Sequence, residues 1–206
     1  MKHTLLLLCL AVPSAALAQI DALENPGSVS AIQERAFRMS HELTLGVGSL
    51  PLDAFYKGFF AQVSYTYHFT DSFAWQVGRG GYSYSLKTGL REQLEKDFGV
   101  IPTVFEEVQY MVGSDLMWKP FYGKAAVLNS SVIYFETHLL AGATVFKFTN
   151  GFKPALNLGL GFRIFQNKVI SYRLDITDNI VFSLQQKPFN VMSIQLMLAL
   201  NFGATE

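Results

Sequence analysis

The side chains that could do chemistry in this 206-residue chain are its histidines and a few charged residues placed within stretches of alternating polarity. Alternation assigns seven of them to one polar face: Glu42, Asp115, Glu136, His138, Arg163, Arg173 and Asp175. If that face is enclosed, its charges must pair, because an unpaired buried charge is costly. A hairpin turn near Asn150-Gly151 would set Glu136 or His138 opposite Arg163. We expect a network of ion pairs, and a proton or small-ion path through the same groups is the alternative.

The elements that carry these residues are strands, because apolar residues recur at every second position. Polar or small residues alternate with the apolar row Met192, Ile194, Leu196, Leu198, Leu200 and Phe202. A phase change at Gly80-Gly81 indicates a bulge in the third strand. Soluble strands usually have about five or six residues, and the segments here are long enough to cross a bilayer. The pattern predicts eight strands, at 39–50, 57–69, 72–86, 105–119, 132–146, 152–165, 168–183 and 189–202.

The composition is typical of a protein whose outer surface does not meet water. Hydrophobic residues make up 50% of the chain and charged residues 16%, against about 25% charged in average globular proteins. A formal net charge of +0 gives no basic field for nucleic acid, so we expect no such partner. Residues 1–18 combine a basic start, an apolar centre and an Ala-x-Ala end, which predicts a signal peptide cleaved after Ala18. Cys9, the single cysteine, lies within it.

A secreted lipocalin-like barrel, apolar inside and polar outside, would alternate in the same way. Its water-facing side would be dense in Lys and Glu, whereas the polar face here carries small uncharged residues such as Thr44, Gly48, Asn157 and Gly161. We therefore expect the apolar face to contact lipid. Aromatic girdles at the lipid headgroups would come from Tyr67, Phe69, Phe73, Trp75, Trp118 and Phe202.

The expected fold is all-β, a closed antiparallel eight-stranded transmembrane β-barrel over residues 39–203, with short periplasmic turns and longer extracellular loops. A periplasmic segment, 19–38, precedes the barrel and a tail, 204–206, follows it. The link at 120–131 is an exception, because it is long and yet periplasmic in this scheme. In the extracellular link 86–104, the spacing of Leu90, Leu94 and Phe98 predicts a short amphipathic helix.

Several stretches carry a family resemblance. Leu50-Pro51-Leu52-Asp53-Ala54-Phe55-Tyr56-Lys57, Tyr65-Thr66-Tyr67-His68-Phe69, Ala74-Trp75-Gln76 and Trp118-Lys119-Pro120-Phe121-Tyr122-Gly123-Lys124 resemble the small outer-membrane β-barrel proteins of myxobacteria and predatory relatives. Gln76 departs from the Glu expected after Trp75. The resemblance spans about residues 30 to 203 and implies location in the outer membrane, with no established molecular function. In architecture the chain is also similar to the OmpA and OmpX transmembrane domains, a likeness of fold alone.

We predict a structural or protein-interaction role at the cell envelope, with outer-membrane lipid around the barrel and the barrel-assembly machinery as a partner during biogenesis. An envelope partner would contact loop 86–104 or segment 19–38. A narrow channel is one alternative and a lipid A-modifying enzyme is another. His41 and His68 lie at the predicted periplasmic end on opposite faces, and His138 lies mid-strand, so no catalytic constellation forms. No His shares ligand-like spacing with a carboxylate or second His, and we expect neither metal nor cofactor.

Overall fold

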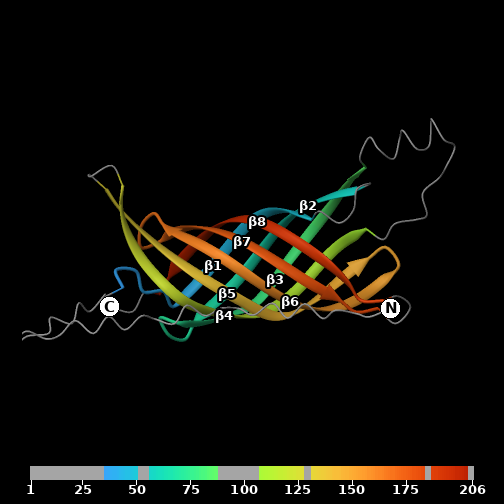
Figure 1. Cartoon of the computed structure of the whole chain (residues 1–206), viewed down its shortest axis with the longest axis horizontal. Helices are drawn as coiled ribbons and strands as arrows, with labels where there is room; N and C mark the ends of the chain where they lie inside the picture. Colours follow the sequence, from blue (N-terminus) through green and yellow to red (C-terminus); the bar gives the residue numbers. More distant parts are fainter. Residues whose placement is uncertain (1–34, 51–55, 88–106, 128–130, 184–186, 204–206) are drawn as a thin grey trace, which may run out of the picture. The chain divides into compact units, whose positions relative to one another are not determined.

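The computed structural model describes residues 35–50, 56–87, 107–127, 131–183 and 187–203, all within one compact unit, Arg35–Glu206. Its eight strands are antiparallel, each pairs with the next, and β1 pairs with β8 to close the ring (Figure 1). The predicted closed eight-stranded barrel is therefore confirmed. Within the described residues, no helix is long and apolar enough to cross a membrane.

The strands span 10 to 20 residues. They are β1 (His41–Leu50), β2 (Tyr56–His68), β3 (Phe73–Lys87), β4 (Val108–Val127), β5 (Ser131–Phe148), β6 (Gly151–Phe165), β7 (Ile170–Val181) and β8 (Phe189–Phe202). Alternation gives each strand an outer and an inner face, because successive side chains point to opposite sides of a sheet.

The outer face of the barrel is apolar and the inner face is largely polar. Leu196 is 59% exposed and Leu158 63% exposed, whereas their neighbours Gln195 and Asn157 are buried. A water-soluble barrel would have the reverse arrangement. Exposed large hydrophobic residues occur on all eight strands, so the apolar surface encircles the barrel.

The link predicted at 120–131 is wrong, because most of it is strand. Residues of β4 from Phe121 onward pair with β5, as in Tyr122↔Glu136 and Ala126↔Val132. Pro120 interrupts the regular ladder in the bulge between Trp118 and Phe121, where a residue without an N–H is tolerated. The two strands therefore continue as a two-stranded ribbon past the barrel wall (Figure 1), and residues 128–130 between them lie outside the described part.

The bulge in β3 also differs from the prediction. The registers with β2 and β4 shift at Val77 and Gly78, not at Gly80-Gly81. This shift moves Arg79 to the inner face and leaves Gly80 with open space beside it. The change of phase was visible in the sequence, but two successive glycines were a misleading marker of its position.

The connections divide between two ends of the barrel. The end that holds the start of β1 and the last residues of β8 also has the β2–β3 and β6–β7 turns, at 69–72 and 166–169; we call it the terminal end. The opposite end has the tight hairpin turn predicted near Asn150-Gly151, where Gly151 adopts a φ of 144°. The β7–β8 connection, 182–188, lies at the same end.

Candidate functional site

The seven charged residues assigned to the polar face all lie inside the barrel and are buried. Glu42 of β1 occupies the centre of the network. Its carboxylate lies 2.6 Å from Arg163 Nη2 and accepts hydrogen bonds from Arg173 Nη1 at 2.7 Å and from Thr44 Oγ1 at 3.0 Å. One carboxylate on β1 thus pairs with arginines of both β6 and β7.

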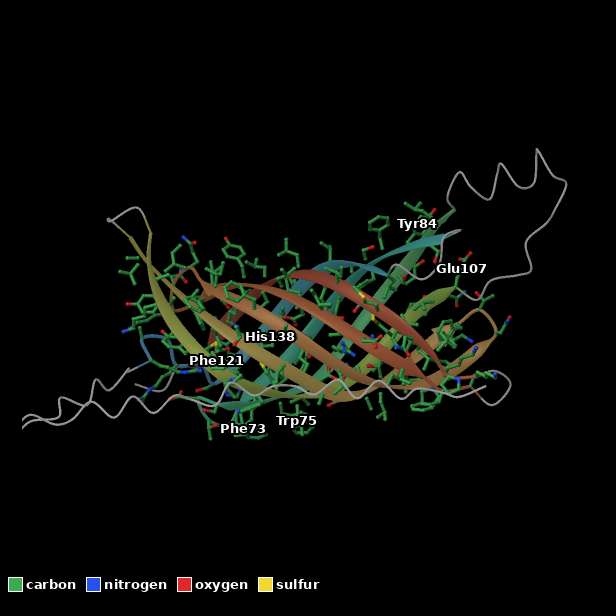
Figure 2. The ribbon with its side chains drawn as sticks, in the orientation of Figure 1. Phe73, Trp75, Tyr84, Glu107, Phe121 and His138 are labelled. Carbon is green, nitrogen blue, oxygen red and sulfur yellow. The ribbon has the colours of Figure 1, made fainter. Side chains whose placement is uncertain are left out.

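A second carboxylate continues the network along β7. Arg173 Nη2 donates to Asp175 Oδ2 at 2.7 Å, and Asp175 Oδ1 lies 2.9 Å from His138 Nε2 (His138 is labelled in Figure 2). The order Glu42, Arg173, Asp175, His138 alternates acid and base across the lumen. Planar guanidinium groups suit such bridging, since one group can serve two carboxylates.

The expected pairing of Glu136 with Arg163 is present in the register but is not the main contact of either residue. The two are directly opposite across β5 and β6, yet Arg163 Nε lies 3.9 Å from Glu136 Oε1. Glu136 is instead held by Arg35 Nη1 at 2.7 Å. The partner of Glu136 is therefore a cation of the N-terminal segment, which the pairing of neighbouring strands could not predict.

Asp115 forms a separate pair with Arg79 Nε at 3.2 Å, and Arg79 also donates to Thr144 Oγ1. Glycine makes room for these groups. A side chain at Gly113 would approach Arg79 within 2.8 Å, and one at Gly161 would overlap both His138 and Asp175. The small residues of the polar face thus leave room for the charged side chains.

Four residues of the network were missed by the sequence prediction: Arg35, His68, Arg79 and Lys119. Lys119 Nζ lies 3.1 Å from His68 Nδ1, and His68 Nε2 lies 3.0 Å from Glu42. Both residues lie within the predicted strands 57–69 and 105–119 at polar-face positions, so alternation alone could have assigned them to the network. Arg79 follows from the correct bulge, whereas no sequence pattern signals the contact of Arg35.

The opposite end of the lumen is filled mainly by apolar side chains, with the Lys153 ammonium over the rings of Phe148 and Phe189. A buried cluster there brings together Leu50, Phe60, Val108, Met111, Phe146, Phe148, Ala155, Val181 and Val191. The rings of Phe146 and Phe148 lie 6.0 Å apart, and Phe189 packs edge-on against Phe148 at 5.8 Å. The lumen is therefore ionic toward the terminal end and mainly hydrophobic toward the other end, which is a poor environment for a permeating ion.

Residues 35–38 cross the inner side of the β4–β5 ribbon. Arg35 lies 4.8 Å above the Tyr122 ring, and the Ala36 N–H donates to Tyr122 Oη at 3.3 Å. Phe37 stacks on Phe165 at 5.2 Å and meets Tyr134 edge-on at 4.9 Å. These contacts anchor the end of the segment predicted at 19–38, whose residues up to 34 lie outside the described part.

The six predicted girdle aromatics are exposed on the outer face and gather near the terminal end. Phe73 pairs with Trp118, Tyr67 with Trp75, and Phe202 with His41. Figure 2 shows Phe73 and Trp75 projecting outward near one end and Tyr84 near the other. The second girdle was not predicted and contains Phe59, Tyr82, Tyr84, Tyr110 and Phe152.

The two girdles are spaced as a bilayer requires. Tyr110 and Trp118 of β4 are eight residues apart, about 27 Å along a strand. With the usual tilt of about 40°, this length corresponds to an apolar band of roughly 20 to 25 Å. The distance between the two aromatic girdles is therefore suited to the hydrocarbon core of an outer membrane.

The described histidines make contacts that stabilise the barrel and do not form a catalytic arrangement. His68 and His138 are enclosed by their carboxylate partners, and His41 lies on the outer face with Nδ1 2.8 Å from Tyr65 Oη. In the described ranges, no group of three or more His, Asp or Glu is arranged to hold a metal ion. The predicted loop helix with Leu90, Leu94 and Phe98 lies outside the described residues.

The fold and the lumen together define a class: an eight-stranded barrel with an apolar exterior and a packed, ion-paired interior. Among solved structures, the chain is similar to the N-terminal β-barrel domain of Pseudomonas aeruginosa OprF, with 11% identity and a TM-score of 0.48 over 80% of this chain and 98% of that one. Neisserial surface protein A has 11% identity and a TM-score of 0.41, covering 79% and 97%. Ail of Yersinia pestis has 14% identity and a TM-score of 0.35, covering 79% and 98%.

Neither protein-family models nor curated proteins give a match to the chain. The resemblance to the small barrels of myxobacteria therefore stays a prediction without support from a family model.

Proposed function

We propose that the chain is an integral outer-membrane β-barrel with a closed lumen, which acts at the cell envelope as a structural or protein-interaction element. The observation that carries this proposal is the inversion of polarity across the wall. Leu196 and Leu158 are exposed while Glu42, Arg163 and Arg173 are buried. In water this arrangement would expose a large apolar surface. In lipid it is favourable, because the strands of the closed ring leave no open edge in the hydrocarbon.

Membrane insertion is tested by extraction. We expect the protein to leave the membrane fraction in detergent but not in high salt, and to change its gel mobility on boiling, as folded barrels do. A salt-extractable or soluble periplasmic monomer would overturn the proposal.

The packed lumen supports a role without conduction. The ionic half pairs its carboxylates with buried cations, and the apolar half places Phe146, Phe148 and Phe189 in mutual contact. Conductance in planar bilayers should therefore stay at background. Clear single-channel steps that change in Glu136→Ala or Arg163→Ala would favour the channel alternative.

The β4–β5 ribbon and residues 35–38 are the surfaces we assign to a partner, together with the predicted contact segments 19–38 and 86–104. Phe121 of the ribbon is 69% exposed beyond the bulge at Pro120, where β4 has left β3. A photo-crosslinker at Phe121 should capture an envelope protein in cells, and one at Leu158 in the lipid-facing band should not. Equal capture at both positions would argue against the ribbon as a contact surface.

We also propose that the barrel performs no acyl transfer. Two of the described histidines are enclosed in the lumen, and His41 contacts Tyr65 and aromatic rings on the outer face. Overexpression should leave the lipid A mass spectrum unchanged. New acylated or deacylated species would support the enzyme alternative.

A further inference from the structure

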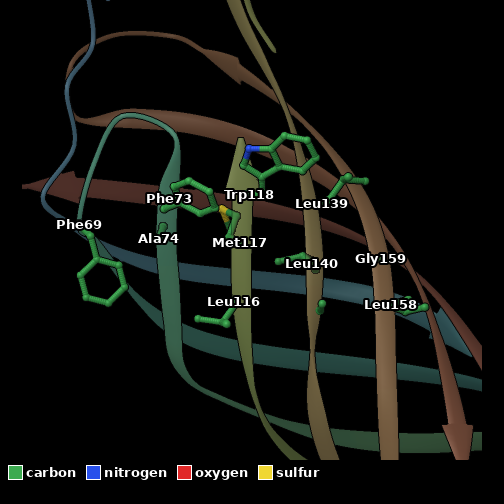
Figure 3. Close-up of a pocket in the computed structure, with 11 residues that line it drawn as sticks. Phe69, Phe73, Ala74, Leu116, Met117, Trp118, Leu139, Leu140, Leu158 and Gly159 are labelled. Carbon is green, nitrogen blue, oxygen red and sulfur yellow. The ribbon is translucent and has the colours of Figure 1, made fainter. Parts of the chain in front are cut away.

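A hollow of about 610 Å³ lies in the outer face of the barrel, over β3 to β6 (Figure 3). Exposed side chains, including Leu116 and Leu158, form its sides, and the buried residues Met117 and Leu140 contribute to its base. The lining is apolar throughout. Its volume lies within the range of about 300–1,000 Å³ that is typical of sites for small molecules.

Water is a poor occupant of this hollow, because an ordered water needs two to four polar partners. An empty space of this size would forfeit dispersion contacts along all of its walls. If the barrel is in a membrane, as we proposed above, hydrocarbon chains surround the hollow. We propose that it is a binding site for one acyl chain of a glycerophospholipid.

The rim of the hollow gives the bound chain a direction. Phe69, Phe73 and Trp118 lie at the end next to the β2–β3 turn, and aromatic residues mark the headgroup level in membrane proteins. The register places Leu116 and its neighbour Ala141 two residues deeper in the wall than Trp118. The glycerol backbone would therefore lie beside Trp118, and the methyl end of the chain would point toward the middle of the barrel.

Trp118 also offers a hydrogen bond to the lipid. The indole Nε1 of Trp75 donates to Ser114 Oγ at 2.9 Å. In the described part of the chain, the corresponding N–H of Trp118 has no protein acceptor, although the side chain is 47% exposed at the rim. An ester or phosphate oxygen of a phospholipid at this level would be the natural acceptor.

Native mass spectrometry of the full-length protein, purified in mild detergent, tests the site directly. We expect the wild-type barrel to retain one glycerophospholipid. Ala141→Leu fills the hollow, whereas Ala143→Leu adds the same bulk on the same strand outside the lining. The ratio of lipid-bound to lipid-free barrel should fall about tenfold in Ala141→Leu, the effect of losing about 1.4 kcal/mol of binding free energy, and should be unchanged in Ala143→Leu.

The outcomes separate this site from the proposed function. Equal lipid retention by both variants, or no retained lipid in the wild type, would overturn the acyl-chain site while heat-modifiable mobility still reports a membrane barrel. Retention of lipopolysaccharide in place of a glycerophospholipid would overturn the choice of ligand. A twofold to fivefold loss of bound lipid in Trp118→Phe, with lipid retention unchanged in Ala143→Leu, would support the hydrogen bond at the rim.

Discussion

Substitution of Glu42 tests whether the luminal charges act as one network. Glu42 is completely buried and lies within 3.0 Å of nitrogen atoms of Arg163, Arg173 and His68. In Glu42→Gln the side chain keeps its size but loses its charge, and its amide N–H groups face cationic donors. Two buried arginines then share fewer carboxylates, so we expect the folded barrel to lose stability.

The size of the loss follows from what each arginine retains. Removal of one partner from a buried ion pair costs about 3–5 kcal/mol. Arg173 still contacts Asp175 at 2.7 Å, whereas Arg163 keeps only the longer contact to Glu136 at 3.9 Å among the described acids. One arginine is therefore still paired and the other is nearly uncompensated, which places the expected loss near 3 kcal/mol.

The measurement is urea unfolding of the barrel in lipid vesicles, followed by tryptophan fluorescence and by heat-modifiable gel mobility. Asp178→Asn is the matched control, since this acid lies near the end of the barrel, with Asn190 Nδ2 donating to it at 2.9 Å, and its loss should have an effect below about 0.5 kcal/mol. Adding Arg173→Met to Glu42→Gln should cost less than the sum of the two single variants. A loss below about 1 kcal/mol in Glu42→Gln, the value of a neutral hydrogen bond, would refute the network.

Three further variants test other parts of the barrel by the same unfolding measurement. Leu196→Arg on the outer face should cost about 2–4 kcal/mol, whereas Asp71→Arg in the exposed β2–β3 turn should be neutral, and equal costs would mean that the faces are wrong. Gly161→Ala should cost about 1–3 kcal/mol because its methyl group overlaps luminal side chains, while Gly80→Ala enters open space; a tolerated Gly161→Ala would contradict the tight packing. Arg35→Ala should cost about 1–3 kcal/mol, because it leaves the buried Glu136 carboxylate without its nearest cation. An unchanged midpoint of urea unfolding would show that the N-terminal contact is dispensable.

The fold could be predicted from sequence because the bilayer enforces a strict period of two. The alternating apolar residues from Met192 to Phe202 indicate which face of the strand contacts lipid. A closed ring is the one arrangement of strands that leaves no unpaired edge in hydrocarbon. The strand ends were harder to place. Pro120 is a strong turn signal, yet at a bulge it interrupts neither the pairing of β4 nor the extension of the ribbon.

Most residues of the candidate site were predictable from the sequence, but the contacts among them were not. Alternation assigns Glu42 and Arg173 to the same face, whereas their contact crosses from β1 to β7 and depends on closure of the barrel. The register between neighbouring strands correctly pairs Glu136 with Arg163, but long arginine side chains reach past their direct neighbours. The contact of Arg35 depends on a segment outside the strands, where no period constrains the chain.

The division of the lumen into an ionic half and an apolar half also bears on how the strands find their alignment. A slip of two residues between neighbouring strands would leave every side chain on its proper face, so the lipid-facing pattern alone cannot prevent it. Such a slip of β6 against β5 would set Arg163 opposite Tyr134 or His138 in place of Glu136. Because Glu42 also binds arginines of β6 and β7, the same charges favour the correct meeting of the first strand with the last part of the chain. The polar interior thereby favours both the correct register and the closure of the ring.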